Sequence, residues 1–97
     1  MYARVSTVEV QPGKMDEAVS VSRDSVLPAA QQQQGFKGGF WMTDLDGNKF
    51  MAVTLWESKE DMEASEAGGY YREQIGKYGG LFAGEVVREA YEVGVQA

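Results

Sequence analysis

Two tyrosines, an arginine and a serine are the side chains in this sequence best suited to chemistry. Tyr70 and Tyr71 directly follow a Gly-Gly pair, and Arg4 and Ser6 lie two residues apart near the N-terminus. A phenol or hydroxyl can donate a hydrogen bond or carry a proton, and a guanidinium can stabilise an anionic oxygen. Packing alternatives exist for each: one tyrosine buried and one exposed, and Arg4 as a solvated or interfacial charge.

The chain contains no histidine and no cysteine. Imidazole bases, thiolate nucleophiles, disulfides and the usual ligands of zinc, copper and haem iron are therefore missing. Asp44, Asp46 and Asn48 surround an Asp-Gly pair but lack the distal glutamate of an EF-hand calcium loop, so they predict a tight turn. We expect this chain to bind no metal and no cofactor.

The length of 97 residues suits one domain, and we treat 1–97 as a single unit. Nine basic and 15 acidic residues give a net charge of -6, which repels phosphate backbones and anionic membrane surfaces. No apolar run approaches the roughly 20 residues that span a bilayer, and the N-terminus does not read as a signal peptide. We expect a cytoplasmic protein that binds neither nucleic acid nor membrane.

The first half of the chain predicts a strand, a helix and a hairpin. Residues 2–10 alternate and are rich in β-branched side chains, which predicts a strand that ends at Pro12-Gly13. From Lys14 the apolar residues fall at helical spacing and predict an amphipathic helix of about four turns that kinks or ends near Pro28. Residues 36–43 and 49–57 flank the Asp-Gly turn and predict a β-hairpin.

The second half predicts an interrupted helix and a last strand. Ser58 is followed three residues later by Asp61, which has the form of a capping box and predicts a helix from about Lys59. Gly68-Gly69 should interrupt this helix, residues 70–78 should resume it, and residues 85–93 should form a strand. The order β-α-β-β-α-β predicts a ferredoxin-like α+β fold, with a four-stranded antiparallel sheet and helices on one face.

The strand at 49–57 is apolar on both of its faces, because side chains alternate along a strand. One set is Phe50, Ala52, Thr54 and Trp56, and the other is Met51, Val53 and Leu55. Two helices cover only one face of a sheet, and a large exposed apolar face is rare on a monomer. We predict a homodimer through the sheet, with scattered surface residues as the alternative. The sequence leaves open which set faces the partner.

Three stretches share their order and spacing with a known family: "QPGKMDEAVS", "LPAAQQQQGFKGGFWMTDLDGNKFMAVTLWESKED" and the closing strand. Through these stretches, which cover nearly the whole chain, the sequence resembles the antibiotic-biosynthesis monooxygenase family of dimeric α/β barrels. The resemblance implies two sheets that face each other across a dimer and a pocket between each sheet and its helices. Members of the family include cofactor-free oxygenases acting on aromatic polyketides, haem-degrading enzymes and many proteins of unknown role.

The resemblance also bears on individual residues. In the haem-degrading and polyketide branches the tryptophan at the end of the third strand looks into the pocket, and here it is Trp56, for which ordinary core packing is the alternative. The haem-degrading branch uses a histidine on the second helical segment and an asparagine where this chain has Ser6. Haem is therefore disfavoured, although a tyrosinate at Tyr70 or Tyr71 can replace imidazole as a ligand of haem iron.

Two functions remain open. The first is a cofactor-independent monooxygenase that oxidises a small aromatic compound, such as an anthrone, phenol or quinol, with dioxygen. The second is a non-catalytic small-ligand-binding or stress-associated dimeric barrel, which the lack of an evident strong base favours. For the first function the candidate residues are Tyr70, Tyr71 and Arg4 for catalysis and Trp56, Ser6 and Phe40 for substrate contact.

Overall fold

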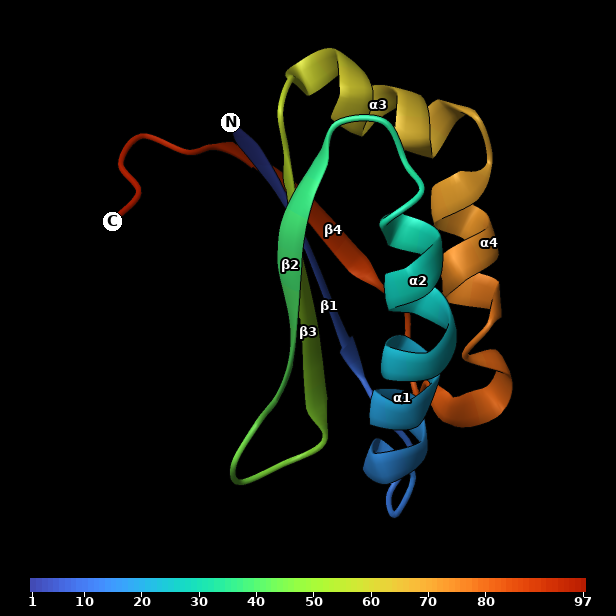
Figure 1. The fold of residues 1–97 in the computed structure, drawn as a ribbon. Helices are drawn as coiled ribbons and strands as arrows, with labels where there is room; N and C mark the ends of the chain where they lie inside the picture. The colour runs from blue at the N-terminus through green and yellow to red at the C-terminus, as the bar shows by residue number, and fades with distance from the viewer.

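The computed structural model describes residues 1–97 and has one antiparallel sheet with helices packed on a single face (Figure 1). The strands are β1 (Tyr2–Glu9), β2 (Phe36–Thr43), β3 (Lys49–Trp56) and β4 (Val87–Glu92). They lie side by side in the order β2-β3-β1-β4, with every neighbouring pair antiparallel. The predicted ferredoxin-like α+β fold is confirmed.

The first helical region is a continuous rod made of α1 (Met15–Val21), a π-helical segment (Ser22–Val26) and α2 (Leu27–Ala30) (Figure 1). In the π segment the Leu27 N–H bonds the Ser22 carbonyl, one residue further back than in an α-helix. Pro28 follows shortly after the π segment, and the helix continues through it in spite of the missing N–H. The rod therefore runs past the proline and ends at Ala30.

The second helical region is bent in the middle. Helix α3 (Lys59–Ala67) begins as predicted, with the Asp61 N–H donating to Ser58 Oγ at 3.1 Å. Gly69, at φ 88°, then turns the chain into α4 (Tyr70–Gly76). A 3₁₀ turn at Gly79–Leu81 leads towards β4. None of the helices is long and apolar enough to cross a membrane.

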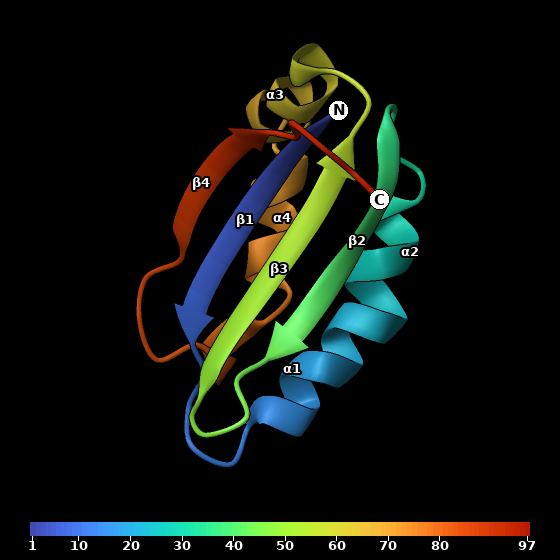
Figure 2. The ribbon, with the colours of Figure 1, turned by 90° about the vertical axis from the view of Figure 1, so that its left-hand side faces the viewer.

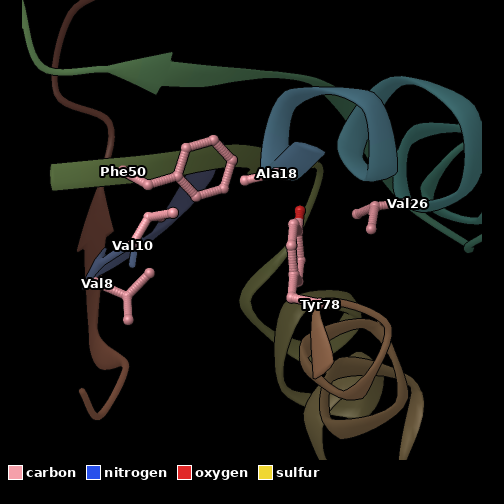
Figure 3. Packing of buried hydrophobic residues seen from close by; sticks show 6 residues of the cluster. All are labelled: Val8, Val10, Ala18, Val26, Phe50 and Tyr78. Carbon is pink, nitrogen blue, oxygen red and sulfur yellow. The ribbon is translucent and has the colours of Figure 1, made fainter. Parts of the chain in front are cut away.

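The two faces of the sheet differ in their cover. Residues 4, 6 and 8 of β1 pair with residues 54, 52 and 50 of β3, and these positions face the helices. The core on this side is the cluster shown in Figure 3, made of Val8, Val10, Ala18, Val26, Phe50 and Tyr78. No helix covers the opposite face, which is turned to the viewer in Figure 2. The structure thus places the set Met51, Val53 and Leu55 on the uncovered face.

A β-bulge changes which side chains of β2 face the helices. Phe36 pairs with Trp56, but Gly38 pairs with Leu55, so the register shifts between them. Counting by twos from Phe36 would put Phe40 on the helix side, and the extra residue reverses that alternation. Trp41 therefore faces the helices, and Phe40 points to the uncovered face.

Candidate functional site

A mostly apolar cavity lies between the sheet and the α4 region. Its wall is formed by Arg4, Ser6 and Val8 of β1, Trp41 of β2, Phe50, Ala52 and Thr54 of β3, Tyr70, Tyr71, Gln74 and Ile75 of α4, Val26 of the π segment, and Tyr78, Phe82 and Val86 after α4. The interior open to the centres of water-sized molecules is about 50 Å³. An apolar cavity of about 150 Å³ holds benzene. An aromatic ligand therefore requires side chains of the wall to move outwards.

Arg4 supplies the charge of this cavity. Its side chain is 4% exposed, and its Nη1 donates to Ser65 Oγ at 2.7 Å, to Glu66 Oε2 at 3.2 Å and to the Met62 carbonyl at 3.5 Å. Burial lowers the pKa of Arg4, and the hydrogen bond to Glu66 opposes that shift. Because every one of these contacts uses Nη1, Nε and Nη2 are the donors left for a ligand.

Tyr71 lies directly against Arg4. The guanidinium carbon of Arg4 is 4.4 Å from the centre of the Tyr71 ring, and that of Arg88 is 5.5 Å from it. The Tyr71 hydroxyl shares a hydrogen bond of 2.7 Å with Ser6 Oγ. The structure therefore brings together three of the sequence-predicted residues, Arg4, Ser6 and Tyr71, at one end of the cavity.

Tyr70 and Gln74 lie one helical turn apart on α4 and both line the cavity. Burial raises the pKa of the Tyr70 hydroxyl, and the nearby positive charge of Arg4 opposes that shift. Gln74 Oε1 is buried without a hydrogen-bond donor. Both predicted tyrosines thus contribute to the wall, rather than one being buried and the other exposed.

The far end of the cavity is closed by Tyr78. Its hydroxyl points towards the rod that carries Ala18 and Val26 (Figure 3) and lies 2.6 Å from Ser22 Oγ. Because the Ser22 hydroxyl donates to the Ala18 carbonyl at 2.8 Å, Tyr78 must be the donor to Ser22. Burial raises the pKa of Tyr78, with the hydrogen bond to Ser22 opposing the shift.

Two of the sequence-predicted substrate contacts are not part of this wall. Trp56 is fully buried, with Nε1 donating to Thr54 Oγ1 at 3.0 Å and its ring 5.7 Å from Phe36. It lies under Arg4, at 5.1 Å, and therefore supports the wall from behind. Phe40 is 60% exposed on the uncovered face, because of the bulge in β2.

Sequence reasoning missed several polar or aromatic wall residues, among them Trp41, Gln74 and Tyr78. Trp41 needs the bulge for its placement, so counting along the strand cannot find it. Gln74 and Tyr78 follow Tyr70 at helical spacing, so the period of four residues was the available signal. No carboxylate lines the cavity, and no three acidic side chains gather closely enough in the structure to suggest a metal site.

Comparison with curated proteins finds relatives without an assigned role. The chain is 37% identical over 65 residues to the uncharacterized protein Rv2558 of Mycobacterium tuberculosis. That match covers 67% of this chain but 28% of the relative, so the chain spans much less than the length of the protein it matches. The relative therefore supports common descent of this region and assigns no activity.

Comparison with solved structures shows the same fold. A putative antibiotic biosynthesis monooxygenase from Deinococcus radiodurans superposes with a TM-score of 0.80 at 17% identity, covering 100% of this chain and 96% of that one. A monooxygenase of Streptomyces coelicolor, solved in complex with Nanaomycin D, gives a TM-score of 0.75 at 19% identity, covering 99% and 89%. The family model described as antibiotic biosynthesis monooxygenase matches residues 1–76. This chain belongs to the antibiotic biosynthesis monooxygenase family.

Proposed function

We propose that the protein binds a small hydroxylated aromatic compound in this cavity and oxidises it with dioxygen, using no bound cofactor. The observation that carries the proposal is Arg4, a buried guanidinium in a wall that is otherwise aromatic, aliphatic or uncharged. A preorganised donor in a dry site stabilises an oxyanion far better than water does. Arg4 would therefore favour the anionic form of a phenol or enol.

An anthrone illustrates how such a reaction balances. Its methylene carbon loses a proton, and the resulting anion carries charge on both carbon and oxygen. The carbon bonds to dioxygen and gives a peroxide, and loss of water then breaks the O–O bond and leaves a carbonyl. One oxygen atom enters the product and the other leaves as water, so the substrate supplies all four electrons.

The proton chemistry limits which substrates are suitable. Because no carboxylate or imidazole lines the cavity, the hydrogen-bonded pair of Tyr71 and Ser6 is the available proton relay. Glu66 lies behind Arg4 and is occupied by it. We therefore expect substrates that are acidic by themselves, such as anthrones and activated phenols, rather than unactivated arenes.

We also infer a homodimer that joins the uncovered sheet faces of two chains. That face gathers exposed or half-exposed apolar side chains on all four strands: Val5, Phe40, Met42, Met51, Val53, Leu55, Val87 and Tyr91. Faces of this kind rarely remain open to water. The sheet-to-sheet arrangement implied by the family resemblance would bury them.

Oxygen uptake and quinone formation with a panel of anthrones and hydroquinones test the proposed oxidation. We expect the protein to accelerate both above a protein-free control, and Arg4→Gln to reduce the acceleration about a hundredfold, as loss of an oxyanion donor typically does. Tyr71→Phe keeps the ring beside Arg4 but removes the relay hydroxyl, so it should also reduce the rate. Tyr2→Phe, which is not among the cavity residues, is the matched control and should leave the rate unchanged.

The same experiment separates catalysis from binding alone. Melting temperatures of the variants show whether a loss of rate comes from unfolding. Absence of acceleration on every compound, with folded wild-type protein, would sink the oxidation and leave a non-catalytic ligand-binding protein. The lack of a carboxylate in the cavity wall is the observation that favours this second function.

A further inference from the structure

The carbonyl oxygen of the Gln74 side chain has no donor in the protein. Gln74 is 6% exposed, and its Oε1 is the only buried side-chain nitrogen or oxygen of the molecule that lacks a hydrogen-bond partner. Leaving such a group unpaired destabilises the folded protein, because its desolvation is not repaid by a hydrogen bond. Buried polar groups in native proteins are nearly always paired, so this atom calls for a donor that the chain itself does not supply.

The place of Gln74 indicates where that donor must come from. The side chain projects from α4 into the cavity, where its neighbours along the wall are mainly aromatic or aliphatic. An aliphatic side chain of similar length would fill the same space without an unpaired carbonyl. Packing alone therefore does not account for an acceptor at this position, and its donor is expected from what the cavity holds.

The cavity has two polar positions at different depths along α4. At the first, Tyr71 contacts both Arg4 and Ser6. Gln74 follows one helical turn later, about 5 Å further along the axis. Gln74 lies between Tyr71 and Tyr78 along the chain, and the Tyr78 ring is 5.8 Å from the ring of Phe50. The cavity wall thus carries a donor-only group, Arg4, and an acceptor, Gln74 Oε1, at different positions.

We propose that Gln74 accepts a hydrogen bond from a ligand hydroxyl and selects aromatic compounds with two oxygen substituents. One oxygen lies at Arg4, which only donates and so favours an anion or carbonyl there. The other is a protonated hydroxyl at Gln74 Oε1, which only accepts. This inference rests on the proposed aromatic ligand but not on its oxidation.

Anaerobic binding of two near-isosteric probes tests the assignment. Hydroquinone carries a hydroxyl at each end, and 4-methylphenol replaces one hydroxyl with a methyl group. Dissociation constants are measured by titration, following chemical-shift changes of the protein. We expect the wild type to bind hydroquinone about tenfold more tightly, because 4-methylphenol leaves the Gln74 carbonyl unpaired.

Gln74→Met, which keeps the side-chain length and removes the acceptor, should reverse this preference in favour of 4-methylphenol. Gln74→Leu repeats the test in case the first variant folds poorly, and the exposed Gln32→Leu is the matched control. Without ligand, Gln74→Met should melt at the same or a higher temperature, because it removes an unpaired buried carbonyl. If Gln74 only supported the fold, replacing it would not reverse which of the two ligands has the lower dissociation constant.

Three results would overturn the proposal: no saturable binding of either probe to the wild type, an unchanged preference in both Gln74 variants, or a clear fall in melting temperature of both ligand-free variants. The proposed oxidation is tested independently of this role of Gln74. If the preference reverses as expected but no compound consumes oxygen, the role of Gln74 stands and the monooxygenase does not. If oxygen is consumed while the preference is unchanged, the monooxygenase stands and the proposed role of Gln74 does not.

Discussion

Arg4 and Tyr78 mark the two ends of the cavity, and each is fixed by a different kind of contact. Arg4 is held by charge: Glu66 accepts from it and also lies 3.4 Å from Arg88. Tyr78 is held by packing and one hydroxyl, with its ring stacked on Phe82 at 4.7 Å. Side chains fixed in this way hold the two ends of the cavity in place, so the outward movement that an aromatic ligand requires falls to the wall between them.

Removal of the Tyr78 hydroxyl should change how stability depends on pH. The pKa of Tyr78 is raised by burial, so the folded state holds its proton at pH values where the unfolded chain loses it. The stabilisation is complete below about pH 10 and is lost as the pH rises towards the folded pKa, by up to about 1.4 kcal/mol per pH unit. Tyr78→Phe should therefore lose less stability than the wild type between pH 8 and pH 11.

Urea unfolding at the two pH values measures the difference, with Tyr2→Phe as the control. At pH 8 the variant should be less stable by about 1 kcal/mol, because Ser22 loses the bond from Tyr78. Ser22 keeps its own bond to Ala18 and is not left unpaired. Equal alkaline losses in wild type and variant would show that Tyr78 is not the group that titrates.

At the scale of elements, the bend between α3 and α4 lets one helical region serve two purposes. Helix α3 presents Ser65 and Glu66 to Arg4, whereas α4 presents Tyr70, Tyr71 and Gln74 to the cavity. Gly69, at φ 88°, makes the change of direction between them without the strain that other residues meet there. The bend thus places the charge partner behind Arg4 and the ligand-facing groups in front of it.

The connection from α2 to β2 depends on Gly35, which combines a positive φ with close contact to α3. Its φ is 82°, and a methyl group built there would collide with the Asp61 side chain. Gly13 has a similar φ of 78° but open space around it. Gly35→Ala should therefore cost about 3 kcal/mol and Gly13→Ala about 1 kcal/mol, since only the first adds a steric clash to the backbone strain.

Urea unfolding of the two variants at one protein concentration measures these costs. The difference between the variants isolates the contact between the β2 entry and the start of α3, because the backbone strain is common to both. Equal losses would show that Asp61 moves away freely and that Gly35 is needed for its φ alone.

The whole molecule has one covered and one uncovered sheet face, and the C-terminal residues after β4 project from the uncovered side (Figures 1 and 2). Only ten apolar residues are buried in the single chain. A domain this small has a narrow stability margin, so burying the second face would add to a limited core. Assembly and stability are therefore expected to be linked.

A charge on the uncovered face should dissociate the inferred homodimer. Phe40→Glu places a carboxylate where the partner sheet would lie, and burying it without a partner is costly. Sedimentation at micromolar concentration should show a dimer for the wild type and a monomer for Phe40→Glu. Leu45→Glu is the control, because Leu45 is 97% exposed in the turn between β2 and β3. A monomeric wild type would refute the dimer.

Local patterns in the sequence were sufficient for the elements and their order. The hairpin strand at 36–43, the cap at Ser58 and the break at Gly68-Gly69 all depend on residues close together in the chain, and the structure has each of them. The last strand was predicted at 85–93 and spans Val87–Glu92, because strand ends depend on the neighbouring β1 rather than on local pattern.

The faces and the site were decided by tertiary structure. Alternation in β3 divides Phe50 from Met51, but only the packing of the helices determines which set is covered. Because of the bulge after Phe36, Trp41 rather than Phe40 lies in the cavity wall. Trp56 is fully buried behind the wall and is not part of it. Arg4, Ser6, Tyr70 and Tyr71 were found from their chemistry, because reactive groups can be recognised by type. The unpaired acceptor of Gln74 could not be found in this way, because whether an acceptor lacks a donor depends on all the residues packed around it.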